Sequence, residues 1–169
     1  MTVEEALISA LNYEHKVRDH YRAASTRTDD AKGREIFSIL ADEEQGHVDY
    51  LNARLEVWRR EGILNSVVIK SVIPTRDWLA RGKGKLHKVS LQRSYDNEIG
   101  MLKDALKLER GVSEHYRALV GALKGEAQQM FRSFLEIEDA HTAIVQSEID
   151  QLEKNAFWFD FSEFDLEAQ

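Results

Sequence analysis

Glu44-Gln45-Gly46-His47 decides the fold of this chain, because its Glu-x-x-His pattern recurs as Glu138-Asp139-Ala140-His141. The two copies are 94 residues apart, since 138 − 44 and 141 − 47 both equal 94. A single glutamate in an apolar stretch precedes each copy. Glu14 lies 30 residues before Glu44 (44 − 14), and Glu109 lies 29 residues before Glu138 (138 − 109).

The residues around the single glutamates repeat as well, with an offset of 95 (109 − 14). Ala10-Leu-Asn-Tyr-Glu14 aligns with Ala105-Leu-Lys-Leu-Glu109, and His20-Tyr-Arg-Ala23 aligns with His115-Tyr-Arg-Ala118. One deletion in the turn that follows explains the change from 95 to 94. The repeat predicts two antiparallel helix pairs related by a pseudo-two-fold axis.

Composition agrees with long helices in one domain covering residues 1–169. The chain is 43% hydrophobic, with one proline, nine glycines and no cysteine. The lack of cysteine excludes disulfides, thiolate zinc sites and rubredoxin-type iron centres. A net charge of −7 argues against general nucleic-acid binding. Because no signal peptide is recognisable and no apolar run approaches the roughly 20 residues that span a bilayer, we expect a cytoplasmic protein without membrane contact.

Apolar residues at 3.6-residue spacing place the helices at about 3–26, 30–61, 92–122 and 126–155. Thr2 and Glu5 form a capping box before the first helix, and Thr28 or Asp29 is expected to cap the second. Residues 62–91 are expected to form a long crossover, with room for a short helical piece. Residues 156–169 form an aromatic tail expected to pack on the bundle or on a partner chain. The fold class is therefore an all-α four-helix bundle.

Six polar residues fall on the faces that should form the core: Glu14, Glu44, His47, Glu109, Glu138 and His141. An unpartnered buried carboxylate is costly, so matched errors of this kind are implausible. Four carboxylates balance the charge of two divalent cations, and each histidine supplies one nitrogen ligand. Mixed oxygen and nitrogen ligands favour iron, with manganese or zinc as alternatives.

One Glu-x-x-His on a charged helix is more often a solvated pair than a ligand set. Two copies on apolar faces, each with its upstream glutamate, favour a di-metal site over a metal-free bundle. Tyr21 and Tyr116 lie two turns beyond Glu14 and Glu109, where each either hydrogen-bonds a ligand carboxylate or packs as a core tyrosine. His20 and His115 should point away from the site. Trp58, Trp78 and Trp158 are interpreted as packing residues.

With these residues in place, the sequence resembles the rubrerythrin family of the ferritin-like superfamily over residues 3–155. The matching text is Tyr13-Glu14 with Tyr21, Ala41-Asp-Glu-Glu-Gln-Gly-His47, Leu108-Glu109 with Tyr116, and Glu138-Asp-Ala-His141. The resemblance implies a ferritin-like bundle with a non-haem di-iron centre that reacts with peroxide or dioxygen. It makes the six core residues the metal ligands and implies a homodimer.

Two features depart from the rubrerythrin pattern. The four-cysteine rubredoxin domain of many rubrerythrins is missing, so electrons must come from a separate donor such as a rubredoxin. Many rubrerythrins also carry a further glutamate one turn after the third-helix ligand. Here Val112 and Ser113 occupy that turn, and Glu114 should face away from the site.

Three functions fit these residues. The first is an oxidoreductase that reduces hydrogen peroxide or dioxygen, with Glu14 and Glu109 as the more mobile or bridging carboxylates. The second is a non-enzymatic iron-binding or oxidative-stress protein. The third and weakest is a di-iron oxygenase that acts on an organic substrate.

Overall fold

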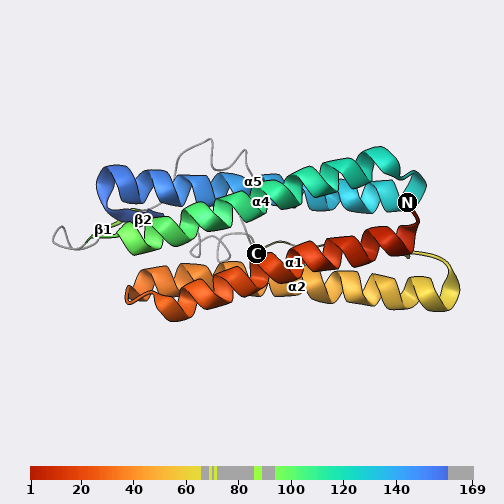
Figure 1. Cartoon of the computed structure of the whole chain (residues 1–169), viewed down its shortest axis with the longest axis horizontal. Helices are drawn as coiled ribbons and strands as arrows, with labels where there is room; N and C mark the ends of the chain where they lie inside the picture. The colour runs from red at the N-terminus through yellow and green to blue at the C-terminus, as the bar shows by residue number, and fades with distance from the viewer. Residues whose placement is uncertain (66–68, 70, 72–85, 89–93, 160–169) are drawn as a thin grey trace, which may run out of the picture.

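A computed structural model describes residues 1–65, 69, 71, 86–88 and 94–159 of the chain. This part contains four long helices, which are α1 (Val3–Arg27), α2 (Ala31–Glu61), α4 (Asp96–Ala122) and α5 (Gly125–Asn155). It also contains two short strands, β1 (Leu86–Lys88) and β2 (Phe157–Phe159). Figure 1 shows the helices side by side as two antiparallel hairpins. The predicted all-α four-helix bundle is confirmed.

The helix ends follow local capping chemistry. Thr2 Oγ1 accepts from Glu5 N, and Glu5 accepts from Thr2 N, so the predicted capping box is present. The expected cap of α2 was wrong by one or two residues, because the N-cap is Asp30, whose side chain accepts from Gly33 N at 2.7 Å. α2 ends at Gly62, where φ is 71°, a conformation that favours glycine.

The core lies between the two hairpins. Within the described residues, α1 packs most closely on α2 and α4 packs most closely on α5, while α1 also packs on α4. Each helix buries its apolar stripe, so the largest buried side chains include Tyr21 and Phe37 in the first half and Tyr116 and Phe131 in the second. None of the four helices combines the length and hydropathy required to span a membrane.

The end of the bundle where α4 begins and α5 ends carries a small antiparallel ladder (Figure 1). His87 of β1 pairs with Trp158 of β2. The Trp158 side chain is fully buried, in contact with the rings of Phe37 and Tyr95. Part of the aromatic tail therefore enters the bundle. The rest of the tail (160–169), and crossover residues 66–68, 70, 72–85 and 89–93, lie outside the described residues.

Candidate metal centre

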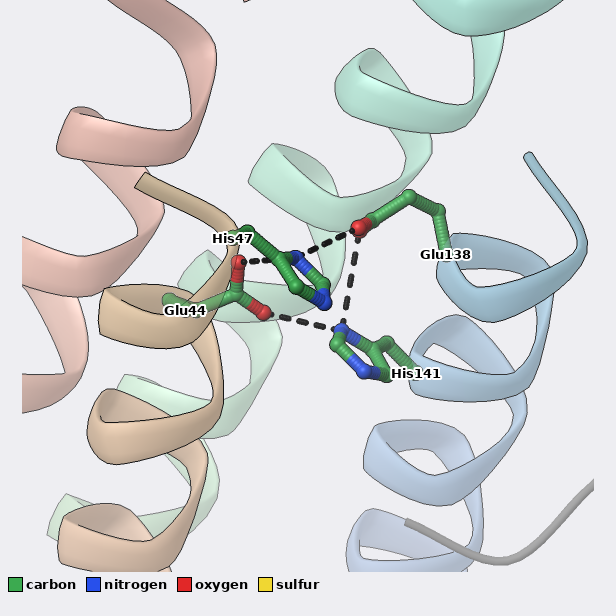
Figure 2. Close-up of side chains that lie close together, drawn as sticks. All are labelled: Glu44, His47, Glu138 and His141. Atoms are coloured by element: carbon green, nitrogen blue, oxygen red, sulfur yellow. Dashed lines mark ion pairs between the residues drawn. The ribbon is translucent and has the colours of Figure 1, made fainter. Parts of the chain in front are cut away.

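Two helix turns, one on α2 and one on α5, bring four metal-binding side chains together at the middle of the bundle. Glu44 and His47 come from α2, and Glu138 and His141 come from α5. All four are buried, and each offers one ligand atom within 4.8 Å of the others. Figure 2 shows the four side chains converging from the two facing helices. The group could hold a metal ion.

Each of the two glutamates lies between both histidines. Glu44 Oε1 is 2.8 Å from His141 Nδ1, and Glu44 Oε2 is 3.3 Å from His47 Nδ1. Glu138 Oε1 is 3.1 Å from His47 Nδ1, and Glu138 Oε2 is 3.6 Å from His141 Nδ1. Neighbouring ligands of one octahedral ion, at roughly 2.1 Å from it, are about 3 Å apart. The spacing of these atoms is therefore close to that of a shared coordination sphere.

The two single glutamates lie beside this group. Glu14 Oε2 is 3.1 Å from His47 Nδ1, and Glu109 Oε2 is 4.0 Å from His141 Nδ1. Both glutamates are fully buried. All six residues singled out in the sequence therefore meet in the core, with Glu14 on the His47 side and Glu109 on the His141 side.

Two tyrosines tie these single glutamates across the bundle. Tyr21 Oη of α1 donates to Glu109 of α4, and Tyr116 Oη of α4 donates to Glu14 of α1. Each tyrosine thus bonds the glutamate of the other helix pair, not the one on its own helix. The crossed arrangement follows the repeat and joins the two hairpins through polar contacts in the core.

Burial is the main influence on the acid–base chemistry of the glutamates. It raises the pKa of Glu44 to about 8 and that of Glu138 to about 7. It also raises the pKa of Glu109 well above its usual value, with repulsion from Glu44 as the next cause. Burial would raise the pKa of Glu14 too, but attraction to His47 and hydrogen bonds lower it overall.

The aromatic groups respond to the same charges. Burial alone would lower the pKa of His47, but the nearby Glu44 and Glu14 raise it well above its usual value. Burial raises the pKa values of Tyr21 and Tyr116 well above normal, and the adjacent carboxylates raise them further. Both phenols therefore stay protonated at neutral pH and remain hydrogen-bond donors.

The hydrogen bonding of the cluster is incomplete without a further group. Among the described residues, no correctly aligned hydrogen-bond partner exists for either oxygen of Glu44 or Glu138, for His47 Nε2, or for either nitrogen of His141. Buried polar atoms left in this state are costly. Ligand atoms that point at a shared cation lie close together without forming hydrogen bonds to one another, and these buried oxygen and nitrogen atoms show that arrangement. The residues present fit a metal centre of mixed oxygen and nitrogen ligands.

Sequence reasoning missed Glu43. This residue is buried on α2, and its Oε1 lies 4.0 Å from His141 Nε2, the nitrogen that faces away from the cluster. At 4.0 Å the two atoms do not form a hydrogen bond, but a small movement would let this carboxylate accept from the ring nitrogen, the kind of contact that orients ligand histidines in metal sites. Helical spacing could have predicted its burial, because Glu43 follows Ile36 by seven residues and Leu40 by three, and both of these residues are buried. Its counterpart in the repeat is Ile137 (43 + 94).

The predicted bystanders are outside the cluster. The Nε2 atom of His20 lies 2.9 Å from the carbonyl oxygen of Met101, and the Nε2 atom of His115 lies 3.0 Å from Ser9 Oγ. Both contacts join α1 to α4. Glu114 is exposed, and Val112 and Ser113 fill the turn after Glu109 with buried side chains that offer no carboxylate.

Comparison of the chain with protein-family models, with curated proteins and with solved structures found no match.

Proposed function

We propose that the chain is a rubrerythrin-like protein of the ferritin-like superfamily. In this proposal it binds two iron ions and reduces hydrogen peroxide, or dioxygen, with electrons from a separate donor protein. The observation that carries the proposal is the placement of Glu44 and Glu138, each of which faces both His47 and His141. Carboxylates between two nitrogen ligands are suited to bridge a pair of cations.

The six core residues divide into two roles. Glu44 and Glu138 are the bridging candidates, which differs from the expectation that Glu14 and Glu109 bridge. His47 with Glu14 would complete one end of the centre, and His141 with Glu109 would complete the other. The four carboxylates carry the charge that two divalent ions neutralise. Manganese and zinc also bind oxygen and nitrogen ligands, so metal analysis is needed to identify the ion.

When bound, a pair of iron ions supplies Lewis acidity, a template for a small oxygen ligand and two electrons. The chain contributes the remaining elements of the reaction. Tyr21 and Tyr116 hold Glu109 and Glu14 in place by donating a hydroxyl hydrogen bond to each carboxylate. Phe134, whose ring centroid lies 5.4 Å from that of His47, belongs to the apolar wall that keeps water out.

The absence of cysteine from the chain supports an external source of electrons, because no thiolate-bound cluster can be built from these residues. A one-electron donor protein, such as a rubredoxin, would have to deliver two electrons in succession. Each peroxide molecule takes up these two electrons and two protons to give two waters.

The test begins with the metal content of protein purified from its own host, since overexpression can load the wrong metal. The iron-loaded protein is then reduced without oxygen and mixed with hydrogen peroxide, while optical spectra are recorded. Repeated turnover with an added reductant supports the proposal. A single stoichiometric oxidation, with no turnover, would identify an iron-binding protein instead of an enzyme.

A further inference from the structure

We infer that Tyr21, Phe37, Trp158 and Tyr95 form an electron-transfer route between the candidate metal centre and a surface hollow at the end of the bundle. The inference rests on the proposed function for its biological use, because only a redox centre would need the route. Its physical content is separate, since it concerns the passage of single electrons through four aromatic rings of this chain.

The rings form a continuous series. Tyr21 bonds Glu109, and its ring centroid lies 6.5 Å from that of Phe37. The Phe37 centroid lies 6.1 Å from that of Trp158, and the Trp158 centroid lies 6.3 Å from that of Tyr95. All four side chains are buried. Electron tunnelling weakens steeply with distance, so a series of aromatic rings with neighbouring centroids no more than 6.5 Å apart is favoured over aliphatic packing.

The route ends at a hollow of about 470 Å³ where α4 begins and α5 ends. Tyr95 lines this hollow together with Asp96, Lys103, Leu152 and Glu153. The hollow is where a one-electron donor can come within reach of the last ring. The same end of the bundle carries the ladder of β1 and β2, which positions Trp158 (Figure 1).

The repeat argues against packing as a sufficient explanation. Tyr21 and Phe37 have counterparts in Tyr116 and Phe131, whose ring centroids are 5.8 Å apart. Among the described residues, however, Phe131 contacts Tyr116 and Phe134 but no tryptophan. Within the part of the chain that the structure describes, only the first half of the repeat leads to an easily oxidised indole and, through Tyr95, to the hollow at the surface.

The residue against which the Trp158 indole packs also differs between the two halves of the repeat. A Cβ atom on Gly33 would lie 2.8 Å from Trp158 Cζ2, so a glycine is needed there for the indole to enter. The counterpart of Gly33 is Ala127 (33 + 94), which has the methyl group that Gly33 lacks. α2 therefore has room for the indole beside Gly33, whereas a methyl group occupies the equivalent position on α5.

Each transfer moves one electron from the donor to the centre. The donor at the hollow is oxidised by one electron, Trp158 and Tyr21 are oxidised and re-reduced in turn, and the centre beside Tyr21 and Glu109 is reduced by one electron. Tyr95 and Phe37 bridge the gaps on either side of the indole, and Phe37 is not itself oxidised. When Tyr21 is oxidised, its hydroxyl proton moves along the hydrogen bond to Glu109, and it returns when the ring is reduced. Two transfers supply the two electrons that convert one hydrogen peroxide into two waters, with protons taken from solvent.

The lack of cysteine allows a site-specific test. Lys103→Cys places one thiol at the rim of the hollow and removes an exposed ion pair with Glu153, which contributes little stability. A ruthenium–polypyridyl photo-oxidant is attached to this thiol and excited by a flash in the presence of a soluble electron acceptor. In metal-free protein we expect an indole radical on Trp158 and then a tyrosyl radical on Tyr21, both recorded by electron paramagnetic resonance. Ring-deuterated tyrosine identifies the second signal as a tyrosyl radical, and its loss in Tyr21→Phe assigns it to Tyr21 and not to Tyr95.

Trp158→Phe should reduce the yield of the Tyr21 radical by an order of magnitude or more, and Trp158→Tyr should restore it, because tyrosine can be oxidised and phenylalanine cannot. Phe37→Leu breaks the series elsewhere and should also reduce the yield. Trp58→Phe, a change on α2 away from the route, should not. Equal yields in the wild-type protein and both Trp158→Phe and Phe37→Leu would overturn the inference.

A second arm separates this inference from the proposed function. In iron-loaded, reduced protein the same flash should oxidise the centre, more slowly in Trp158→Phe. If the chain binds no iron but the metal-free result holds, the proposed function fails and the route stands. If iron binds and its flash oxidation does not depend on Trp158, the route is wrong and the proposed function stands.

Discussion

The imidazole rings of His47 and His141 lie parallel, with centroids 5.3 Å apart and an interplanar angle of 4°. They come from equivalent positions of the repeat, 94 residues apart (141 − 47). Each directs its Nδ1 atom at the carboxylates between them. This symmetric pair of candidate nitrogen ligands is the feature from which we propose two metal ions.

Glu109→Ala separates a ligand from a bystander. The change leaves three carboxylates to face two dications, and Val112 and Ser113 offer no replacement one turn later. We expect the second iron to be lost or greatly weakened, as measured by metal content per chain. Glu114→Ala, on the exposed face of the same helix, is the matched control and should keep two metals. Two metals in both variants would show that Glu109 is not a ligand.

The metal-free protein should lose stability as pH rises. Burial raises the pKa values of Glu44 and Glu138 to about 8 and about 7 in the folded state, from 4.5. A raised carboxylate pKa stabilises the fold fully below its unfolded value, and this stability is lost as pH rises through the folded value. The raised pKa of His47 acts in the same direction. Glu14 acts in the opposite direction, but only below its usual value of 4.5.

The measurement is the melting temperature from slightly acid to moderately alkaline pH, through about 7 and about 8. We expect a decline in metal-free protein and none in the metal-loaded form, because bound cations keep the carboxylates ionised and binding releases their protons. A melting temperature of the metal-free protein that stays level or increases across this range would contradict the account of the buried carboxylates.

Tyr116→Phe should weaken metal binding without removing a ligand. The change deletes the hydroxyl that donates to Glu14 and leaves a buried carboxylate oxygen short of a partner. Loss of such an orienting contact typically costs roughly 10- to 100-fold in metal affinity. Tyr13→Phe is the control, since Tyr13 stacks on His115 away from the cluster. Equal iron affinities in the two variants, by competition with a chelator, would leave the tyrosine as a packing residue only.

Gly33→Ala tests the seat of Trp158. Its new methyl group would lie 2.8 Å from the indole, so we expect a loss of about 1–3 kcal/mol in the free energy of unfolding. Gly46→Ala, on the same helix with no atom within 4 Å of the new methyl, should instead gain about 0.5–1 kcal/mol. The free energy of unfolding of both metal-free variants is measured by denaturant titration. A Gly33→Ala protein as stable as Gly46→Ala would refute the close contact.

Helix positions could be predicted from the sequence because apolar spacing and caps are local. The capping box of Thr2 and the stop at Gly62 appear as predicted, and the repeat predicted which faces meet. The start of α4 was less well predicted, at 92 instead of Asp96, because Tyr95 gives no side-chain cap to mark it. Strand β1 was missed, since three residues stabilised by a partner some 70 positions later carry no local signal.

The candidate site was predictable as a set of residues but not as an arrangement. Periodicity placed the six polar residues on core faces, and the structure brings them together. It could not show that Glu44 and Glu138 lie between the histidines, or that each tyrosine crosses to the opposite helix pair. Those relations depend on how the hairpins are rotated against each other, which is set by packing between distant residues.

Diffraction from iron-loaded crystals, with anomalous scattering measured at the iron absorption edge, tests the central claim most directly. The account predicts two anomalous peaks in the core of each chain, flanked by Glu44 and Glu138, with one near His47 and the other near His141. No peak among these residues, or iron bound only at the protein surface, would contradict it.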